Sequence, residues 1–319
     1  MRFSKESIFL FCILLVVSIL TACSSTNEEG NSEAVQTEEK VKQTRSYKDY
    51  IGHEVEIPVS PEKVIYHGEN YGDLLPLQVE PIGASYSWIK NFIFEDKVSN
   101  VEEVGFPINT EKVLELQPDL IIIATTDEKT YEQLSKIAPT IVFDTFAPLE
   151  ARLIELGDIL DKKQEAADWL NEYDKKEENM WKQLVQDGTI KSGETASVLT
   201  YYPGNRLFVM ASTGLSQVLY DPDGFKPGEK IQQILDAKMG FEEISLETLP
   251  EFAGDRIFIL TPETDEAIQS TKDMLDSSIW KGLPAVKNEN VYTLEIQKSS
   301  SDASTRDWLL EEIPSLLKK

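Results

Sequence analysis

The chain has 319 residues, of which 41 % are hydrophobic and 27 % are charged, and its formal net charge is −25. This length is sufficient for two domains of ordinary size, and the composition is that of a globular protein. The excess of carboxylates argues against nucleic acid as a partner, because such interfaces need clustered Lys and Arg. It does not exclude an anionic ligand, since a few convergent arginines can reverse the local field.

The first 22 residues form a predicted export signal. Arg2 and Lys5 precede a nearly unbroken apolar run from residue 8 to 20, and Leu-Thr-Ala-Cys ends at Cys23. The run is shorter than the roughly 20 residues that a bilayer crossing prefers, so a permanent transmembrane helix is the weaker alternative. Leu-Thr-Ala-Cys resembles the bacterial lipobox, which implies a lipidated Cys23 at the start of the mature protein. We therefore expect the protein outside the cytoplasm, anchored by lipid to the outer face of a bacterial cell membrane.

Reactive and metal-binding side chains are scarce after the signal. The other cysteine, Cys12, lies within the signal, so no thiol remains for a disulfide, a zinc site or a nucleophile. His53 and His67 alone cannot build a multi-histidine metal site. We predict no catalytic residue and no metal ligand. After the lipidated Cys23, the residues up to 45 are polar and include no aromatic residue, so residues 23–45 are predicted to be a flexible tether.

A strand and helix rhythm follows the tether. Strands are expected at residues 63–66, 81–85, 119–124 and 140–143, with a helix beginning at 73–77 and another at 131–137. A second series, after about residue 188, predicts strands at 196–201, 207–210, 256–260 and 290–294 and helices at 217–220, 231–237 and 308–317. Alternation of this kind favours parallel sheets covered by helices.

Between the two series lies a helix at residues 149–160 and then a pattern from about 162 to 186 that contains no Gly or Pro. Its apolar residues recur at helical spacing, and such a helix would be about 37 Å long. We predict an N-terminal lobe at 46–160, a connecting helix at 161–187 and a C-terminal lobe at 188–319. The expected fold is two α/β lobes with mostly parallel sheets, joined by one long helix, with the ligand cleft between the lobes.

An internal repeat supports two similar lobes. Residues 111–123 return 136 positions later as residues 247–259, with five of thirteen positions identical. Glu111 matches Glu247, and Asp119 matches Asp255 at the entrance of a strand. A short helix that feeds a buried strand explains the pattern without any function. The two aspartates are expected to be structural.

Several short motifs, in this order and spacing behind a lipobox, resemble those of solute-binding lipoproteins of ABC importers for ferric siderophores and cobalamin. They are Pro61-Glu-Lys-Val-Ile65, Leu77-x-Val-x-Pro-Ile-Gly83, Val104-Gly105, Asn109-x-Glu111-Lys, Pro118-Asp-Leu-Ile121, Ile137-Ala-Pro-Thr140, Ile244-Ser-Leu-Glu-x-Leu249, Gly254-Asp255 and Val286-Lys-Asn-x-x-Val-Tyr292. The resemblance runs from about Pro61 to the C-terminus. It implies a monomeric binding protein that delivers its ligand to a membrane permease.

The resemblance also implies that Glu111 and Glu247 are permease-docking residues, because each lobe in this family presents a glutamate to arginines of the permease. Two exposed carboxylates on two lobes give orientation and encounter rate more than affinity. The simpler interpretation is that both are first-turn glutamates, with Asn109 and Ser245 as helix caps.

For this family we expect ligand contacts from loops at the carboxyl ends of strands in both lobes. Aromatic residues with a few cations suit a ferric siderophore. The candidates are Tyr71, Tyr86, Trp88, Lys90, Tyr201, Tyr202, Arg206, Lys298 and Arg306. The siderophore's own oxygens would hold the ferric iron, so the lipid on Cys23 is the only covalent group expected. Arg306 has an alternative role in pairing with Asp302 or Glu311 on the last helix.

The sequence leaves the kind of chelate open. Hydroxamate binders of this family often have aromatic residues where this chain has Glu263-Thr-Asp265 and Lys298-Ser-Ser-Ser301. A citrate-derived or carboxylate chelate would use Arg206, Lys298 and Arg306. A haem or cobalamin ligand is an alternative, with Tyr201, Tyr202 or His67 as an axial ligand to haem. A surface-anchored α/β hydrolase is a weaker alternative, since there is no Gly-x-Ser-x-Gly and no His-Glu-x-x-His motif.

Overall fold

The structure is a computed structural model that describes residues 43–318. The predicted export signal, Cys23 and the predicted tether as far as residue 42 lie outside the described residues. Within residues 43–318, no helix is both long enough and apolar enough to cross a membrane.

The described chain begins with an antiparallel hairpin of β1 (Thr44–Lys48) and β2 (Glu54–Pro58). The tether predicted for residues 23–45 therefore extends two residues too far, into a strand. Asp49 in the turn is buried, and its carboxylate accepts hydrogen bonds from the backbone N–H groups of His53 (2.7 Å) and Val142 (2.9 Å). Because Val142 belongs to the first large sheet, Asp49 attaches the hairpin to the N-terminal lobe.

The N-terminal lobe contains a sheet of five parallel strands in the order β5-β4-β3-β6-β7. The strands are β3 (Val64–His67), β4 (Gly83–Ala84), β5 (Glu102–Glu103), β6 (Leu120–Ile123) and β7 (Thr140–Val142). The helices are α2 (Thr110–Leu116), α3 (Glu128–Leu134) and α4 (Leu149–Ile159), with 3-10 turns η1 (Tyr71–Asp73), η2 (Tyr86–Trp88) and η3 (Glu95–Lys97). Every residue of β3, β6 and β7 is buried, as is typical of parallel strands covered on both faces. The predicted parallel sheet is confirmed.

The helix predicted to begin at residues 73–77 is wrong. The structure has the single 3-10 turn η1, followed by further turns. Asp73, the last residue of η1, is fully buried, and its carboxylate binds Arg152 of α4 and the backbone N–H of Ala303, each at 2.7 Å. These contacts are distant in sequence and override the local helical pattern.

The C-terminal lobe contains a mixed sheet in the order β11-β9-β8-β12-β13, with β10 paired to β8. The strands are β8 (Thr195–Tyr202), β9 (Arg206–Met210), β10 (Lys226–Pro227), β11 (Phe241–Ile244), β12 (Arg256–Thr261) and β13 (Val291–Glu295). The helices are α6 (Leu215–Leu219), α7 (Glu229–Asp236), α8 (Leu249–Phe252), α9 (Asp265–Asp276), α10 (Ser278–Gly282), α11 (Pro284–Lys287) and α12 (Ala303–Leu317), with the 3-10 turn η4 (Ile296–Ser299). Strands β8, β10, β12 and β13 are parallel, whereas β9 and β11 add antiparallel pairs at one edge.

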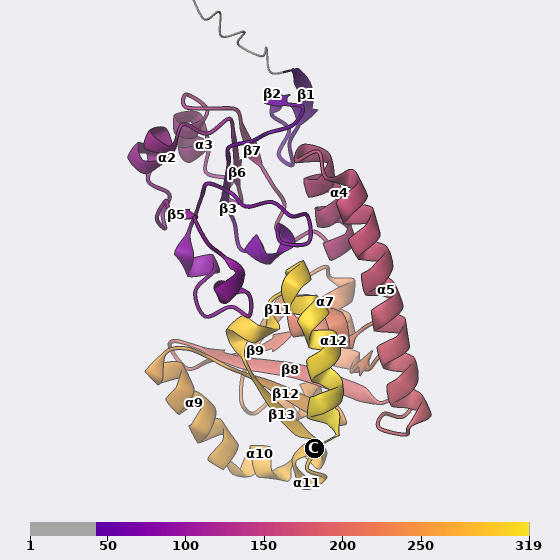
Figure 1. The fold of residues 1–319 in the computed structure, drawn as a ribbon. Helices are drawn as coiled ribbons and strands as arrows, with labels where there is room; N and C mark the ends of the chain where they lie inside the picture. The colour runs from indigo at the N-terminus through magenta and orange to yellow at the C-terminus, as the bar shows by residue number, and fades with distance from the viewer. Residues whose placement is uncertain (1–42, 319) are drawn as a thin grey trace, which may run out of the picture. The chain divides into compact units, whose positions relative to one another are not determined.

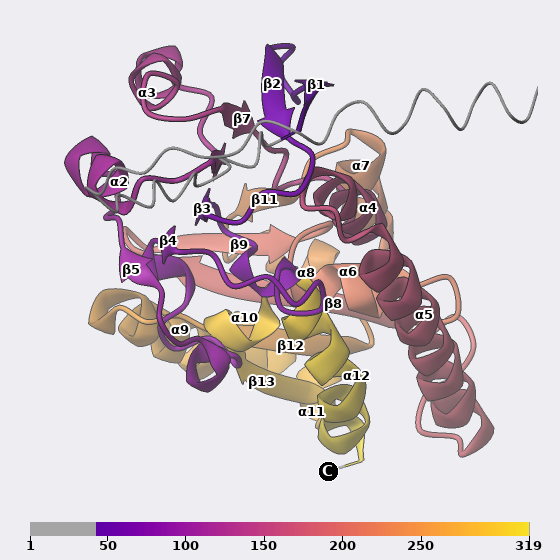
Figure 2. The same ribbon diagram turned by 45° about the horizontal axis from the view of Figure 1, so that its top comes forward.

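The long helix α5 (Lys163–Gln186) has 24 residues and confirms the helix predicted for residues 162–186. Its buried face consists of Ala166, Tyr173, Met180, Trp181 and Leu184. Along its length α5 contacts first α4 and then α12. It lies beside α12 in both views of the fold (Figure 1 and Figure 2).

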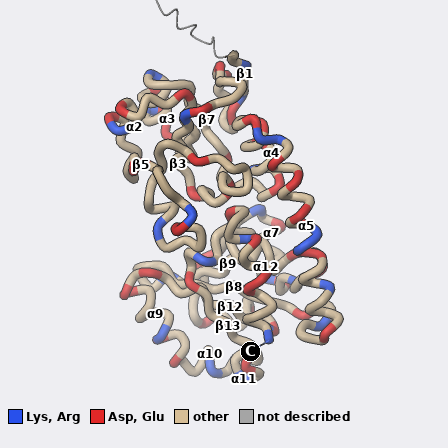
Figure 3. Tube along the Cα trace, viewed as in Figure 1, with Lys and Arg blue, Asp and Glu red and all other residues tan. Residues whose placement is uncertain are grey.

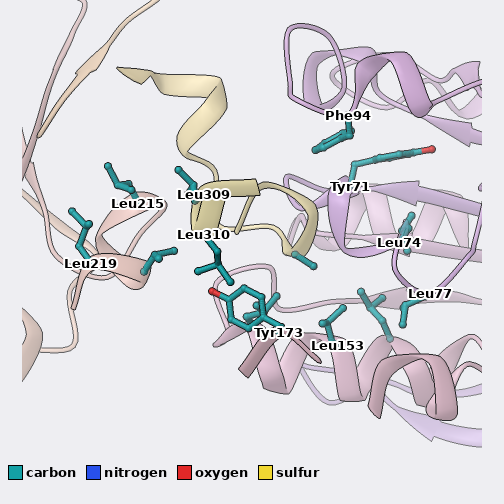
Figure 4. Close-up of a cluster of buried hydrophobic side chains, with 14 of the residues drawn as sticks. Tyr71, Leu74, Leu77, Phe94, Leu153, Tyr173, Leu215, Leu219, Leu309 and Leu310 are labelled. Atoms are coloured by element: carbon teal, nitrogen blue, oxygen red, sulfur yellow. The ribbon is translucent and has the colours of Figure 1, made fainter. Parts of the chain in front are cut away.

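One hydrophobic core extends through both lobes. It includes Tyr71 of the N-terminal lobe, Leu153 of α4, Tyr173 of α5, and Leu309 and Leu310 of α12 (Figure 4). Separating the lobes would expose this apolar surface to water, at a cost of about 25 cal/mol for each Å². The shared core therefore favours a fixed arrangement of the two lobes.

The internal repeat forms the same unit in both lobes, a short helix that leads into a buried strand. Asp119, just before β6, accepts a hydrogen bond from the backbone N–H of Lys63 (2.8 Å). Asp255, just before β12, accepts one from the backbone N–H of Thr195 (2.9 Å). Each aspartate thus fixes the start of the neighbouring parallel strand, β3 or β8. The predicted structural role of the two aspartates is confirmed.

Candidate ligand-binding site

A cavity of about 650 Å³ lies between the two lobes. From the N-terminal lobe, it is lined by residues that follow the carboxyl ends of β3, β4 and β7, as expected for parallel α/β sheets. The lining consists of Glu69, Asn70, Tyr86, Ser87, Trp88, Lys90, Asn91, Phe92, Phe146, Tyr202, Met210, Thr213, Gly214, Phe241, Leu260, Glu263, Ile296, Gln297, Ser299, Ser300 and Ser301.

The C-terminal lobe contributes one face of its sheet as well as loops. Phe241 of β11 is paired with Met210 of β9, and Tyr202 of β8 is paired with Arg206 of β9. Because residues two apart on a strand share a face, Tyr202, Met210 and Phe241 lie on the same side of the sheet. The expectation that all contacts come from carboxyl-end loops therefore holds only in part for this lobe, because the antiparallel strands β9 and β11 extend the sheet beneath the cavity.

Four large aromatic side chains of the lining are exposed to solvent. The exposed fractions are 75 % for Phe146, 49 % for Phe241, 46 % for Tyr86 and 40 % for Tyr202. Large aromatic side chains are normally buried, and a group of them left exposed around one cavity is typical of a site that covers them with a ligand. Two of the four come from each lobe.

The aromatic residues of the N-terminal lobe are held in place by their neighbours. The hydroxyl of Tyr86 donates a hydrogen bond to the carbonyl of Val101 (2.7 Å), and its backbone N–H donates to Glu103 (2.7 Å). Trp88 makes an edge contact with Phe106, with ring centroids 5.7 Å apart. The turn η2, which carries Tyr86 and Trp88, is thereby fixed without burying either ring.

The aromatic residues of the C-terminal lobe form a row on the sheet. Tyr202 contacts Phe208 edge to face with centroids 5.3 Å apart, and Phe208 contacts Phe241 in the same way at 5.7 Å. The sheet covers part of the Tyr202 ring, and this partial burial raises the pKa of its phenol, which is neutral at physiological pH. The rings of this row are uncharged, and the guanidinium of Arg206 lies over Phe208, 4.8 Å from its ring centre. The row offers apolar ring surface on which a bulky ligand can pack.

Three charged residues line the cavity, and two of them are acidic. One carboxylate oxygen of Glu69, Oε2, is shielded from solvent and has no hydrogen-bond partner. Glu263 accepts a hydrogen bond from the side-chain amide of Asn91 (3.3 Å), which joins the two lobes at the cavity. Lys90 is exposed. Carboxylates are also widespread over both lobes (Figure 3).

Among residues 43–318, no group of three or more His, Cys, Asp or Glu side chains is arranged to hold a metal ion. The chemistry available at the cavity consists of aromatic packing, hydroxyl and amide hydrogen bonds, and a few charges.

Four of the predicted contact residues line the cavity, namely Tyr86, Trp88, Lys90 and Tyr202. Two others lie in hydrophobic cores. Tyr71 is 1 % exposed and stacks on Phe94, with centroids 5.9 Å apart. Tyr201 is 7 % exposed and belongs to a second core, on the opposite face of β8 from Tyr202.

The three remaining predicted residues are cations that lie outside the lining and are paired elsewhere. Arg206 forms an ion pair with Glu243 (2.9 Å), and Lys298, which lines an adjoining pocket, pairs with Glu295 (3.1 Å). The side chain of Arg306 is 11 % exposed and lies 3.7 Å from Glu177 of α5.

Arg306 therefore pairs with a residue far away in sequence, whereas pairing with Asp302 or Glu311 was expected as the alternative. Asp302 instead caps α12, accepting a hydrogen bond from the backbone N–H of Thr305 (2.9 Å).

Sequence reasoning missed Glu69, Phe146 and Phe241 among the lining residues. Glu69 and Phe146 each follow the carboxyl end of a predicted strand, so the rule that identified Tyr86 could have included them. Phe241 had no comparable signal, because β11 was not predicted.

The two glutamates of the repeat are exposed. Glu111 is in the first turn of α2, and the Asn109 side chain caps this helix as predicted. Glu247 lies in the turn before α8, whose N-cap is Thr248 rather than the predicted Ser245. Hydrogen bonds from its own backbone N–H and from the Ser245 hydroxyl lower the pKa of Glu247, so its carboxylate is charged at neutral pH.

Comparison with known proteins identifies the family. A family model described as periplasmic binding protein matches residues 67–297, which is well over half of the chain. The chain belongs to the periplasmic binding protein family. This family member is 32 % identical to the iron(3+)-hydroxamate-binding protein YxeB of Bacillus subtilis (strain 168), over 90 % of this chain and 88 % of that protein.

Two further similarities cover most of the chain. The family member is 29 % identical to the Bacillus subtilis (strain 168) protein named "Probable siderophore-binding lipoprotein YfiY", over 99 % of both chains. Its fold matches the crystal structure of Staphylococcus aureus SirA complexed with staphyloferrin B, with a TM-score of 0.77 and 28 % identity over 86 % of this chain and 99 % of that one. The family and the two-lobed fold predicted from the sequence are confirmed.

Proposed function

We propose that this protein is the extracytoplasmic binding component of an ABC importer, which captures a ferric siderophore between its lobes and delivers it to a membrane permease. The observation that carries the proposal is the group of exposed aromatic side chains that both lobes present to one cavity, Tyr86 and Phe146 from one and Tyr202 and Phe241 from the other. The names of its relatives, which refer to iron hydroxamates and siderophores, support this ligand class.

The lining suits an iron atom that is already wrapped by a chelator. It contains no His or Cys, so the ligand's own oxygens would satisfy the metal, and the protein would bind the outside of the chelate. Ring faces pack against the apolar arms of such a ligand, and the exposed side chains of Ser87 and Asn91 offer hydrogen bonds. Binding by this means involves no bond chemistry, and the proposed protein is not an enzyme.

Delivery would use the exposed pair Glu111 and Glu247. Glu111 lies in the first turn of α2 and Glu247 just before α8, and each of these short helices leads into a strand of its own lobe, so the two carboxylates stand on similar scaffolds. A hydrophobic core that continues through both lobes would keep the pair in a fixed relation, which favours a two-point electrostatic contact with permease cations.

The remaining parts of the proposal concern the whole chain. A signal at 1–22, a lipid on Cys23 and a tether that ends before β1 would hold a monomeric protein at the outer face of the membrane. The lobes would correspond to residues 46–160 and 188–319, with the connecting helix at 161–187.

Tryptophan fluorescence of the full-length protein in non-ionic detergent tests the proposal, because Trp88 lines the cavity. The titrants are ferric hydroxamate, citrate-type and catecholate chelates, the same chelators without iron, haem and cobalamin. We expect saturable, submicromolar quenching by at least one ferric chelate. Tight binding of haem or cobalamin with no response to any ferric chelate would overturn the proposed ligand.

A further inference from the structure

The charges around the cavity are unbalanced. Its lining contains two acidic residues, Glu69 and Glu263, and one basic residue, Lys90. The shielded Oε2 of Glu69 lacks a hydrogen-bond donor, so nothing that the structure describes offsets the charge at that atom by hydrogen bonding. A carboxylate in a partly desolvated cavity acts on a ligand through a lower effective dielectric constant than water provides.

The two arginines that the sequence suggested as ligand contacts are each held in an ion pair. Arg206, which lies over the Phe208 ring beside the cavity, is paired with Glu243, and Arg306 is paired with Glu177 on α5. Neither arginine is among the residues that line the cavity. An anionic chelate would therefore meet no arginine in the lining and would approach two carboxylates.

The space next to the cavity is more acidic still. An adjoining pocket of about 530 Å³ shares Asn91, Phe92, Glu263 and Gln297 with the cavity. Its lining adds Glu95, Asp96 and Glu295, whereas its one lysine, Lys298, is paired with Glu295. A ligand that extends from the cavity into this pocket would enter a negative potential, in a protein whose net charge is already −25.

We infer that the cavity selects ferric chelates that carry no net negative charge, with Glu69 and Glu263 as the residues that discriminate against anionic ones. The inference rests on the proposed function. In a trihydroxamate, three anionic donors neutralise Fe³⁺, so the charge of the complex is that of its end group. The exposed aromatic side chains of both lobes would hold the neutral body, and an ammonium end group would be attracted by Glu263 and the acidic pocket beside it.

A series of ferric chelates that share one body and differ in the charge of the end group tests the effect of ligand charge. A linear ferric trihydroxamate ending in a primary ammonium carries +1, its N-acetyl derivative 0 and its N-succinyl derivative −1. Calorimetric titration of the full-length protein in detergent at 20 mM NaCl should give affinities in the order cation, neutral, anion. We expect about a tenfold difference between the two ends of the series, and a smaller ratio at 300 mM NaCl because salt screens the potential.

Four variants test which residues cause the dependence of affinity on ligand charge. Glu69→Gln and Glu263→Gln should each reduce the cation-to-anion affinity ratio about threefold, while the neutral chelate changes little. Lys90→Gln should increase the ratio. Glu132→Gln, an exposed residue of α3 outside both linings, changes the net charge equally and should leave the ratio unchanged.

The outcomes separate this inference from the proposed function. Equal affinities across the series, or tightest binding of the anion, would overturn the charge selection and leave siderophore binding intact. Binding of ferric citrate-type or catecholate chelates with no binding of the three hydroxamates would also overturn the charge selection and leave siderophore binding intact. Failure of every ferric chelate to bind would remove the proposed function itself, and the charge selection with it.

Discussion

Asp73 and Arg152 form an ion pair in which both side chains are fully buried, with 2.7 Å between Asp73 Oδ2 and Arg152 Nε. The second oxygen of Asp73 accepts a hydrogen bond from the backbone N–H of Ala303, the first residue of α12 (2.7 Å). Arg152 donates to the carbonyl of Ser301 (2.7 Å). One pair of charges in the N-terminal lobe therefore holds the start of the last helix.

Replacing Arg152 with Met should lower the free energy of unfolding by about 3–5 kcal/mol, because it leaves the Asp73 carboxylate buried without its partner. Urea denaturation followed by circular dichroism measures the change. The control is Arg45→Met, which removes a half-exposed ion pair with Asp158 (2.8 Å) and should cost less than about 1 kcal/mol. Equal losses in the two variants would show that the buried pair contributes no more than a surface pair.

The pH dependence of stability should contain a contribution from Asp302. Burial and the nearby Asp73 carboxylate raise the pKa of Asp302 from its ordinary 3.8 to about 6. The folded state thus holds this proton more tightly than the unfolded state does. The resulting stabilisation is complete below about pH 3.8 and is lost as the pH rises through 6.

Asp302→Asn removes this titration and retains a residue that can cap α12. The variant should gain stability relative to the original protein between pH 4.5 and pH 7.5, by up to about 3 kcal/mol. Urea denaturation at the two pH values gives the difference. A stability difference that stays constant with pH would contradict the prediction.

Removing one aromatic ring from the cavity should weaken chelate binding. We expect Trp88→Ala and Tyr202→Ala each to lower the affinity for a ferric chelate at least tenfold, because each ring contributes to a packing surface of one lobe. Calorimetric titration is suitable, since its signal does not depend on Trp88. Tyr50→Ala is the control, because Tyr50 is 56 % exposed and lies outside the cavity lining. Unchanged affinity in both cavity variants would place the ligand elsewhere.

Docking to the permease and binding of the chelate should depend on different residues. In cells, changing Glu111 and Glu247 together to Ala should strongly reduce chelate uptake, while the affinity of the purified protein stays within about threefold. The repeat supplies a matched control, the double change of Glu115 and Glu251 to Ala, four positions further along in each copy. Loss of chelate binding in the first variant, or equal loss of uptake in both, would argue against the docking role.

The sequence predicted those parts of the fold that local patterns determine. The helix α5 could be predicted because no Gly or Pro interrupts its apolar face, and the buried strands β6 and β12 because short apolar runs follow Asp119 and Asp255. The cavity residues Tyr86 and Trp88 could be found because they follow the carboxyl end of a parallel strand. Each of these signals lies within a few residues of the feature that it predicts.

The features that could not be predicted from the sequence depend on ion pairs and strand pairing between residues that are far apart in the chain. Arg206 was predicted as a ligand contact because arginines are few and it follows a turn, and the structure pairs it with Glu243 of another strand, just as it pairs Arg306 with Glu177 of α5. Tyr201 and Tyr202 are neighbours in sequence, but only the register of β8 decides which of them faces the cavity. No local pattern contains these pairings.

The hydrogen bond from Ala303 to Asp73 joins residues 230 positions apart in the chain. A nascent N-terminal lobe contains Asp73 and Arg152 long before the segment that completes their environment has been made. Contacts of such separation carry a cost in loop-closure entropy, and folds rich in them fold slowly. The start of the final helix therefore completes the surroundings of the first lobe's buried charges, and a chain that ends before residue 302 would lack the backbone N–H of Ala303 that binds Asp73.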